Sequence, residues 1–217
     1  MSTQKLSKEI KIIIISSVVL FLIAISFLFI SKVQNKDAGA HQPINNLTRE
    51  FNHRSGPDYA KVKIVEFYDP ECEACAGFYP YIKEAMKKYE GKIQLIVRYA
   101  LYHGNSKLAA IATEAAGEQN KFWEYQELLF LNQHEWSHKQ FPATEYFLKY
   151  AMYLKLDETK FKKDYEKEIN FKNIKLDLED GAKIGVNGTP TIFINETKLE
   201  TINPSLFFQK IEEELQK

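Results

Sequence analysis

The sequence contains little cysteine: the two cysteines in its 217 residues are Cys72 and Cys75, within the stretch FYDPECEACAGFYP. Two cysteines exclude a fold that is held together by a framework of several disulfides. A bond between residues this close together would also close a loop too short to constrain much of the unfolded chain. The pair therefore serves redox chemistry, forms part of a metal site, or is a chance proximity of two unreactive thiols.

The sequence also lacks an excess of charge of either sign. Lys and Arg together number 29, as do Asp and Glu, so the formal net charge is zero. Proteins that hold the phosphate backbone of a nucleic acid generally present a large basic surface, and this composition predicts none. The hydrophobic content of 45% and the charged content of 27% are typical of a globular protein, and the length suits one domain.

One long segment near the N-terminus has no charge at all. Residues 12–31 form an apolar run of 20 residues, which matches a helix that crosses a lipid bilayer. The lysines within residues 1–11 favour a cytoplasmic location for that end, so the remaining chain would lie on the extracytoplasmic side. The small residues Ala38, Gly39 and Ala40 leave a cleaved signal peptide as the alternative, although the apolar run is longer than the usual core of a signal peptide.

The segment that follows the apolar run is polar. Residues 32–54 predict a tether, and residues 55–217 predict the folded domain that it carries. With or without cleavage, the domain would reach an oxidising compartment, where a disulfide can persist.

The first part of the predicted domain alternates between strand and helix patterns. Residues 61–68 and 92–102 are rich in β-branched and aromatic side chains and predict two strands. Between them, apolar side chains at helical spacing predict a helix over residues 72–89. Strand, helix and strand in this order indicate a βαβ unit with a parallel strand pair.

The second part of the predicted domain is helical before it returns to strands. Residues from about 104 to 184 carry apolar groups spaced by three and four residues, and this segment is too long for a loop. Residues 191–195 and 198–202 then predict a strand pair, and residues 204–216 predict an amphipathic helix. The sequence thus predicts an α/β fold, βαβ then ββα in one sheet, with a helical subdomain between them.

Cys72 and Cys75 lie at the predicted start of the first helix, at a spacing that places both side chains on one helical face. The free N–H groups and the positive partial charge of a helix N-terminus favour a thiolate at Cys72. Cys75 lies one turn later and is expected to be the less accessible thiol, which resolves a mixed disulfide on Cys72. A Cys-x-x-Cys pair in a βαβ context is a redox signature.

The motif VEFYDPECEAC, together with GVNGTPTIFIN near the C-terminus, resembles the thioredoxin superfamily. Within it the sequence is most similar to DsbA-type thiol–disulfide oxidoreductases, and NSKLAAIATEAAGEQNKFWEYQELLF is similar to the first inserted helices of that type. The resemblance covers about residues 55–217 and implies an extracytoplasmic thioredoxin fold with an inserted α-helical subdomain. It implies neither an organic cofactor nor a metal, because the redox-active disulfide takes that role.

The resemblance also assigns roles to residues outside the cysteine pair. Glu66 corresponds to a buried acid near the resolving cysteine, where desolvation would raise its pKa and suit it to accept a proton from Cys75. A Glu on an open face or edge of the strand is the alternative. Thr189 and Pro190 correspond to a cis-proline loop that faces the cysteines, where the residue before the proline pairs with an extended substrate backbone. An ordinary trans proline at the start of a strand is the alternative.

The dipeptide Glu73-Ala74 between the cysteines departs from the Pro-His of the best-known strongly oxidising members of the family. Asp69 and Glu71 add further negative charge, which disfavours a thiolate. A less stabilised thiolate makes a less oxidising couple. We therefore predict a weaker oxidant than the Pro-His type.

A second motif, His134-Glu135-Trp136-Ser137-His138, matches the zinc-protease pattern H-E-x-x-H. That pattern needs a helix that continues past it, and the following Phe-Pro dipeptide breaks the helix almost at once. We interpret the match as chance and expect these to be surface or lid residues.

The sequence thus predicts a monomeric, membrane-anchored thiol–disulfide oxidoreductase on the outer side of a bacterial inner membrane. Its expected partners are cysteine-containing protein substrates and a membrane protein that regenerates the pair, with no nucleic acid. Substrate oxidation is the expected direction, and isomerisation or reduction are alternatives. A metal-binding or metal-delivery module, in which Cys72 and Cys75 hold a soft ion such as copper(I), is the alternative from another class. A binding protein on a thioredoxin scaffold is the third possibility.

Overall fold

The structure is a computed structural model that describes residues 47–217, except for the side chains of residues 168–170. The predicted segments 1–11 and 12–31, and the predicted tether as far as residue 46, lie outside the described residues. Within residues 47–217, no helix combines the length and the apolar character that a membrane span requires.

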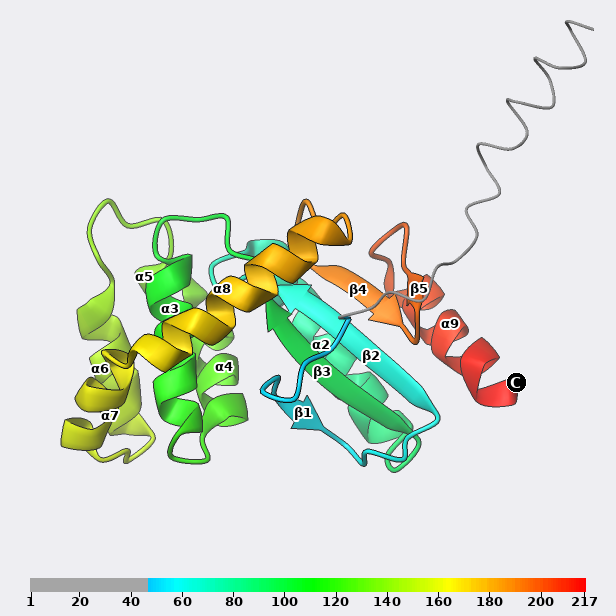
Figure 1. The fold of residues 1–217 in the computed structure, drawn as a ribbon, viewed down its shortest axis with the longest axis horizontal. Coiled ribbons are helices and arrows are strands. Elements are labelled where there is room, and N and C mark those ends of the chain that lie inside the picture. The colour runs from blue at the N-terminus through cyan, green and yellow to red at the C-terminus, as the bar shows by residue number, and fades with distance from the viewer. Residues whose placement is uncertain (1–46) are drawn as a thin grey trace, which may run out of the picture. The chain divides into compact units, whose positions relative to one another are not determined.

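The described chain forms one sheet with the strand order β1-β3-β2-β4-β5 (Figure 1). β2 and β3 pair in parallel, from Val62 opposite Ile93 to Tyr68 opposite Tyr99, which confirms the predicted βαβ unit. β4 pairs antiparallel with β2, so the C-terminal strands join the same sheet and leave β2 at its centre. The strand bounds are β1 Arg54–Ser55, β2 Val62–Tyr68, β3 Ile93–Tyr99, β4 Thr191–Ile194 and β5 Thr197–Lys198.

Two helices cover one face of the sheet, α2 (Glu73–Lys88) and α9 (Pro204–Gln216). Apolar side chains of both helices meet those of β2 and β3 in a common core, among them Ile64, Ile82 and Phe207. α9 begins where the Asn203 side chain accepts hydrogen bonds from the next free backbone N–H groups, with a proline at the first helical position. These contacts position the N-terminus of α2 at the end of β2.

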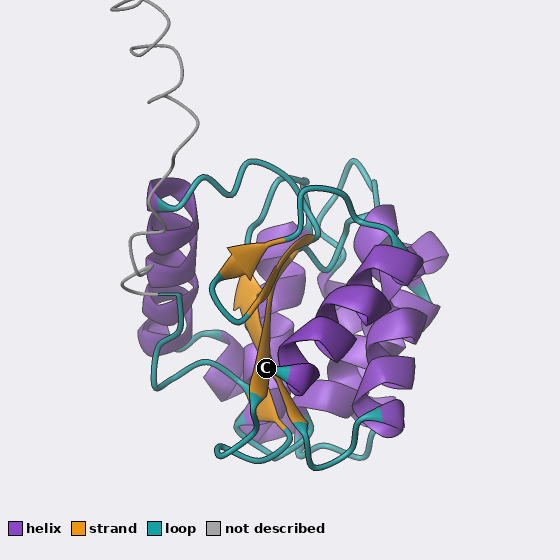
Figure 2. Cartoon of the chain, turned by 90° about the vertical axis from the view of Figure 1, so that its right-hand side faces the viewer, coloured by secondary structure: helices purple, strands orange, loops and turns teal. Residues whose placement is uncertain are grey.

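The opposite face of the sheet packs against α8 (Glu168–Lys183), so the sheet has helices on both sides (Figure 2). Val65, Phe67 and Phe193 point to this side, because side chains alternate between the two faces of a strand. α8 runs diagonally from the other inserted helices to the sheet (Figure 1). It therefore connects the helical subdomain to the sheet.

The helical subdomain lies between β3 and β4, as predicted, and its helices run from residue 106 to residue 183. It has a core of its own, built around the buried aromatic side chains Tyr125, Trp136, Phe147 and Phe161. Besides α8, its helices are α3 (Ser106–Gly117), α4 (Phe122–Leu131), α5 (Gln133–Trp136), α6 (Thr144–Tyr153) and α7 (Glu158–Tyr165).

Some predicted strand boundaries were wrong. β3 ends at Tyr99 and not at residue 102, because the Tyr102 N–H leaves the sheet and donates to the Asp69 carboxylate at 2.7 Å. β5 ends at Lys198, because it is the edge strand of the sheet and the chain continues from there toward the cap of α9.

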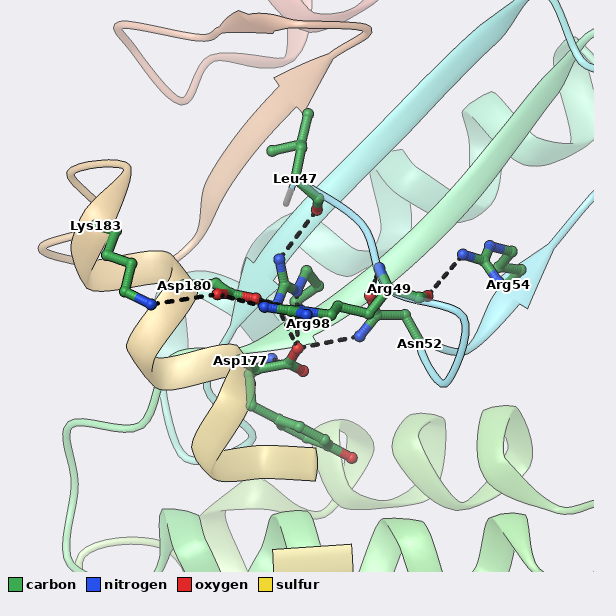
Figure 3. Close-up of polar contacts among 9 residues, drawn as sticks. Leu47, Arg49, Asn52, Arg54, Arg98, Asp177, Asp180 and Lys183 are labelled. Carbon is green, nitrogen blue, oxygen red and sulfur yellow. Dashed lines mark hydrogen bonds and ion pairs between the residues drawn. The ribbon is translucent and has the colours of Figure 1, made fainter. Parts of the chain in front are cut away.

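The predicted boundary between tether and domain was also too late. Leu47 is buried among side chains of β2, β3 and β4, and its carbonyl accepts a hydrogen bond from Arg98 at 3.2 Å. Arg49 forms two hydrogen bonds with Asp180 of α8, at 2.7 and 2.9 Å. Asn52 donates to Asp177 at 3.1 Å (Figure 3). Residues 47–54 are therefore part of the folded domain.

The same contacts surround a buried ion-pair network. The Arg98 guanidinium, on β3, has no exposed side-chain surface and pairs with Asp177 and Asp180, each at 2.8 Å (Figure 3). Arg54 donates to the backbone carbonyl of Arg49 at 2.7 Å. All three arginines of the chain thus meet in one place, on the face of the sheet that packs against α8.

Candidate active site

The two cysteines lie where β2 ends and α2 begins. Cys72 is the N-cap residue of α2, with an extended backbone, and Cys75 is in the first helical turn. Both thiols are free in this structure. Cys72 has 8% of its surface exposed and Cys75 has none, so Cys75 is the less accessible of the two, as predicted, although Cys72 is more covered than its place at a helix end led us to expect.

The surroundings of Cys72 favour its thiolate. The pKa of Cys72 is lowered to about 5, chiefly by a hydrogen bond with the Cys75 thiol. Burial acts in the opposite direction, while hydrogen bonds with the Thr189 side chain and with backbone N–H groups of the first helical turn lower the pKa further. The unpaired backbone N–H groups at the helix N-terminus thus donate hydrogen bonds to Cys72, as the sequence predicts. Cys72 has the character of a nucleophile or leaving group at neutral pH.

The surroundings of Cys75 favour its thiol. Burial raises the pKa of Cys75 far above its ordinary value, and the hydrogen bond to Cys72 and the charge of Glu66 raise it further. Glu66 lies on the central strand and is only 2% exposed, so it does not occupy an open face or an edge. Desolvation raises the pKa of Glu66 to about 8, with a contribution from the Cys72 charge. Near neutral pH this carboxyl can therefore hold or release a proton beside Cys75.

The loop before β4 faces the cysteines. The Thr189–Pro190 peptide bond is cis, as the resemblance implied. The Cys72 Sγ lies 3.4 Å from the Thr189 carbonyl oxygen, to which the thiol donates. The structure therefore brings Cys72, Cys75 and Glu66 together with the Thr189–Pro190 loop, which lies more than a hundred residues later in the sequence.

The acidic residues around Cys72 do not act as the sequence led us to expect. The Asp69 carboxylate accepts hydrogen bonds from the backbone N–H groups of Glu71 and Tyr102, at 2.8 and 2.7 Å, and pairs with the His103 ring at 2.8 Å. Glu73 pairs with the His138 ring at 2.6 Å. The expectation that these charges leave the Cys72 thiolate disfavoured was wrong, because they are held by donors and the pKa of Cys72 is lowered.

Glu71 has a separate structural role. It is fully buried, and its carboxylate accepts from the backbone N–H groups of Asn105 and His138, both at 2.6 Å, and from the Ser106 hydroxyl at 3.3 Å. One side chain next to Cys72 therefore holds two connections of the helical subdomain, the one before α3 and the one after α5.

The H-E-x-x-H segment is not a helical metal motif. α5 ends at Trp136, and His138 adopts a left-handed backbone with φ of 55°, so the two histidines do not share a helical face. Glu135 is engaged by Tyr150 at 3.1 Å. Within the part of the chain that the structure describes, no cluster of three or more His, Cys, Asp or Glu side chains has the arrangement of a metal site.

Sequence reasoning missed His103 and His138, which both lie beside the segment that carries Cys72. They line a cavity of about 480 Å³ together with Glu71 and the exposed Phe141. His138 was visible in the sequence only as part of a motif interpreted as chance. No sequence signal links His103 to Asp69, because a long stretch of chain separates them.

Comparison with known proteins identifies the family. The thioredoxin family model matches residues 48–213, which is most of the chain. The structure resembles oxidised BdbD from Bacillus subtilis, with a TM-score of 0.69, 25% identity, and coverage of 76% of this chain and 94% of that chain. Alpha-DsbA1 from Wolbachia pipientis has the same fold, with a TM-score of 0.72, 18% identity, and coverage of 79% and 94%.

Similar sequences fall into two groups. Probable disulfide bond formation protein D of Bacillus cereus is 31% identical over 153 residues, which cover 64% of this chain and 68% of that protein. The Na⁺/H⁺ antiporter NhaA of Herminiimonas arsenicoxydans is 29% identical over 150 residues, which cover 69% of this chain but only 23% of the antiporter. The chain therefore spans less than a quarter of the length of that antiporter. The family match, the fold and the disulfide bond formation protein together place this chain in the thioredoxin family, among its DsbA-type members.

Proposed function

We propose that this protein exchanges disulfides with cysteine-containing protein substrates through Cys72 and Cys75, chiefly as an oxidase. The observation that carries the proposal is the opposite tuning of two neighbouring thiols. The pKa of Cys72 is lowered to about 5, whereas the pKa of Cys75 is raised. A thiol of low pKa leaves readily from a mixed disulfide, so oxidation of substrate is favoured over its reduction.

The reaction begins with the disulfide form of the pair. A substrate thiolate attacks the Cys72 sulfur, the Cys72–Cys75 bond breaks, and Cys75 leaves with the electron pair and takes a proton from Glu66. A second substrate thiolate then attacks the substrate sulfur of the mixed disulfide, and Cys72 leaves as a thiolate. The substrate has lost two electrons and gained a disulfide, and the protein is left as the dithiol.

Two features suit Thr189 and Pro190 to hold the substrate. The loop lies against the Cys72 sulfur, where the substrate cysteine must bind. An extended substrate backbone can pair with the main chain of Thr189, since strand addition is a common mode of peptide recognition.

Glu66 donates a proton to Cys75 and accepts it back, because it is buried beside that thiol and its pKa is raised to about 8.

We also propose that the domain acts outside a bacterial cytoplasmic membrane, as a monomer on a single N-terminal anchor. The apolar run over residues 12–31 and the lysines before it support this location. A single redox pair must be regenerated after each turnover, so a membrane redox protein in the same bilayer is the partner that this arrangement favours.

Trapping tests the proposed function. In the Cys75→Ser variant, substrate attached to Cys72 has no resolving thiol, so mixed disulfides with proteins are expected to accumulate, and Cys72→Ser is expected to abolish them. Oxidation of a reduced peptide with two cysteines should require both thiols and persist in the presence of a metal chelator. Activity that is lost with the chelator would favour the copper module instead, and two silent Cys→Ser variants would favour a binding protein.

A further inference from the structure

Two imidazoles of the helical subdomain lie beside the segment that carries Cys72. His103 belongs to the connection between β3 and α3, and His138 to the connection between α5 and α6. Their ring centroids are 5.5 Å apart, and the rings meet edge to face at 81°. Both rings line the same cavity, so solvent reaches them from one side.

Each imidazole is paired with a carboxylate that is close to Cys72 along the chain. His103 Nδ1 lies 2.8 Å from the Asp69 carboxylate, and His138 Nε2 lies 2.6 Å from that of Glu73. The backbone carbonyl of Asp69 in turn accepts a hydrogen bond from the Cys72 N–H at 3.1 Å. The two rings are therefore fixed relative to the reactive cysteine by contacts on both of its sides.

These pairs change the charge that Cys72 experiences. The dipeptide between the cysteines contains a carboxylate and no cation. An imidazolium offsets the repulsion that an unpaired carboxylate exerts on a thiolate. The titratable groups around the two rings come from two segments, namely Asp69, Glu71, Cys72 and Glu73 before and within α2, and Lys139 after α5.

We propose that His103 and His138 are positioning residues that stabilise the Cys72 thiolate with positive charge, and that the protonation of His103 is linked to the redox state of Cys72. The proposal rests on the proposed role of Cys72 as the exchanging thiol. When Cys72 is oxidised its negative charge disappears, and the His103 ring binds its proton less tightly. The helical subdomain thereby supplies the positive charge that the dipeptide between the cysteines lacks.

The environment of His103 agrees with this assignment. Burial acts to lower the pKa of His103, but the hydrogen bond and the charge of Asp69 outweigh it, and the charges of Cys72 and Glu71 add to the increase. The pKa of His103 is therefore raised above its ordinary value of 6.5. Because linkage is reciprocal, a thiolate that raises the pKa of His103 is itself stabilised by the imidazolium.

The two histidines are expected to contribute unequally. The side chains of His103 and Asp69 are 29% and 0% exposed, whereas those of His138 and Glu73 are 50% and 68% exposed. Exposed pairs are screened by solvent and salt. His103 should therefore dominate the effect on Cys72, and His138 should have a smaller, more salt-dependent effect.

The first test compares the two redox forms of the unchanged protein. Titration of the imidazole proton signals by NMR is expected to give His103 a higher pKa in the dithiol form than in the disulfide form, by about half a unit or more. His134 is exposed and lies in the H-E-x-x-H segment that also contains His138, so it serves as the internal control. Identical His103 titrations in the two forms would overturn the proposal.

The second test measures the thiol itself. At pH 4, below the pKa of Cys72 of about 5, the alkylation rate follows the thiolate fraction. His103→Gln is expected to slow alkylation of Cys72 by about threefold, which corresponds to a pKa increase of half a unit, while His134→Gln leaves the rate unchanged. An unchanged rate in His103→Gln, with native circular dichroism, contradicts the proposal.

These measurements are independent of the proposed function. They report ionisation and not turnover, so a protein that fails to oxidise peptides but shows the redox-linked shift of His103 would refute only the proposed exchange activity. A protein that oxidises peptides without that shift would refute only the role of the two histidines.

Discussion

Glu66 and Asp180 are buried on opposite faces of the sheet and have pKa shifts of opposite sign. On the face covered by α2, Glu66 is buried without a cationic partner among its described contacts, and desolvation raises its pKa to about 8. On the face covered by α8, Asp180 is equally inaccessible but is held by Arg49 and Arg98, and its pKa is lowered. The comparison of these two carboxyls indicates that cationic partners favour the charged form, whereas desolvation without such a partner favours the protonated form.

The two carboxyl groups that pair with Arg98 also differ in the direction of their pKa shifts. Burial raises the pKa of Asp177, although the charge and the hydrogen bond of Arg98 act to lower it. The single guanidinium of Arg98 therefore supports two carboxylates and the backbone of the N-terminal segment. Its removal should disturb this face of the sheet more than any change at the active site.

The largest expected effect is the loss of Arg98. Arg98→Met leaves two carboxylates without their buried cation, so the free energy of unfolding is expected to fall by about 3–5 kcal/mol in denaturant titrations. Lys183→Met is the matched control, because Lys183 is exposed and lies 4.0 Å from Asp180, and it should change stability little. A small loss in Arg98→Met would show that the network does not hold this face of the domain.

The second effect concerns Glu71, on the active-site side. The Glu71 carboxylate now accepts hydrogen bonds from several donors. Glu71→Gln replaces one of its oxygens with an amide N–H₂ group, which cannot accept them, and an unsatisfied buried polar group costs about 1–3 kcal/mol. The free energy of unfolding should fall by this amount, and hydrogen exchange should accelerate in both connections that Glu71 holds. Glu84→Gln, at an exposed position of α2, is the control. Unchanged exchange in the connections before α3 and after α5 would contradict the structural role of Glu71.

The third effect tests Glu66 as the unpaired carboxyl. Its folded pKa of about 8 lies above the ordinary value of 4.5, so between these pH values the folded state binds a proton that the unfolded state releases. Stability must therefore fall as pH rises through this window. In the disulfide form neither thiol titrates and the Cys72 charge is absent, so the part of this decline that desolvation causes should remain, and Glu66→Gln should lack it. A decline of equal size in both proteins would exclude Glu66 as its source.

The Glu66→Gln variant also tests whether this carboxyl accelerates the reaction of Cys75. Without a carboxylate to accept the Cys75 proton, attack of Cys75 on a mixed disulfide at Cys72 is expected to slow by about tenfold or more. Stopped-flow measurement with a mixed disulfide to a small thiol would show this. A matched rate in Glu66→Gln would mean that another group or solvent takes the proton.

The sequence predicted the framework of the fold and the residues of the candidate site. Strand patterns, helical periodicity and the Cys-x-x-Cys pair are local signals, and the structure has the βαβ unit, the helical subdomain and the Thr189–Pro190 loop that they and the resemblance implied. The proximity of Glu66, Cys75 and Thr189 to Cys72 also agrees with the expectation. The catalytic roles of these residues stay a prediction, which the trapping and kinetic experiments test.

Contacts between distant segments that no motif marks were not predictable. The pairing of His103 with Asp69 and the pairing of Arg49 with Asp180 depend on how separate helices and connections dock. Charge in the sequence does not reveal its partner, so the sequence predicts that Asp69, Glu71 and Glu73 disfavour the Cys72 thiolate and does not show that they contact the helical subdomain. For the same reason, the segment before β1 was assigned to the tether, although Arg49 and Asn52 fix it to α8.

The smallest expected effect concerns the reduction potential. The pKa of Cys72, about 5, lies between the values of about 7 for thioredoxin and about 3.5 for DsbA. The potential should therefore lie between about −270 and −120 mV, the values of those two proteins. A potential in this range keeps the prediction of a weaker oxidant than the Pro-His type. The reason is now the pKa of Cys72 and not uncompensated acidic charge around it. Equilibration with glutathione measures it, and a potential at or above that of DsbA would contradict the prediction.

The central claim is that Cys72 is the acidic thiol of the pair. Its most direct test is the pH dependence of thiolate absorbance at 240 nm in the reduced protein, with mass spectrometry to identify which cysteine a limiting amount of iodoacetamide modifies. A single ionisation is expected near pH 5, with Cys72 as the modified residue and Cys75 unreactive up to pH 9. An ionisation near the ordinary cysteine value of about 8.5, or modification of Cys75 first, would contradict it.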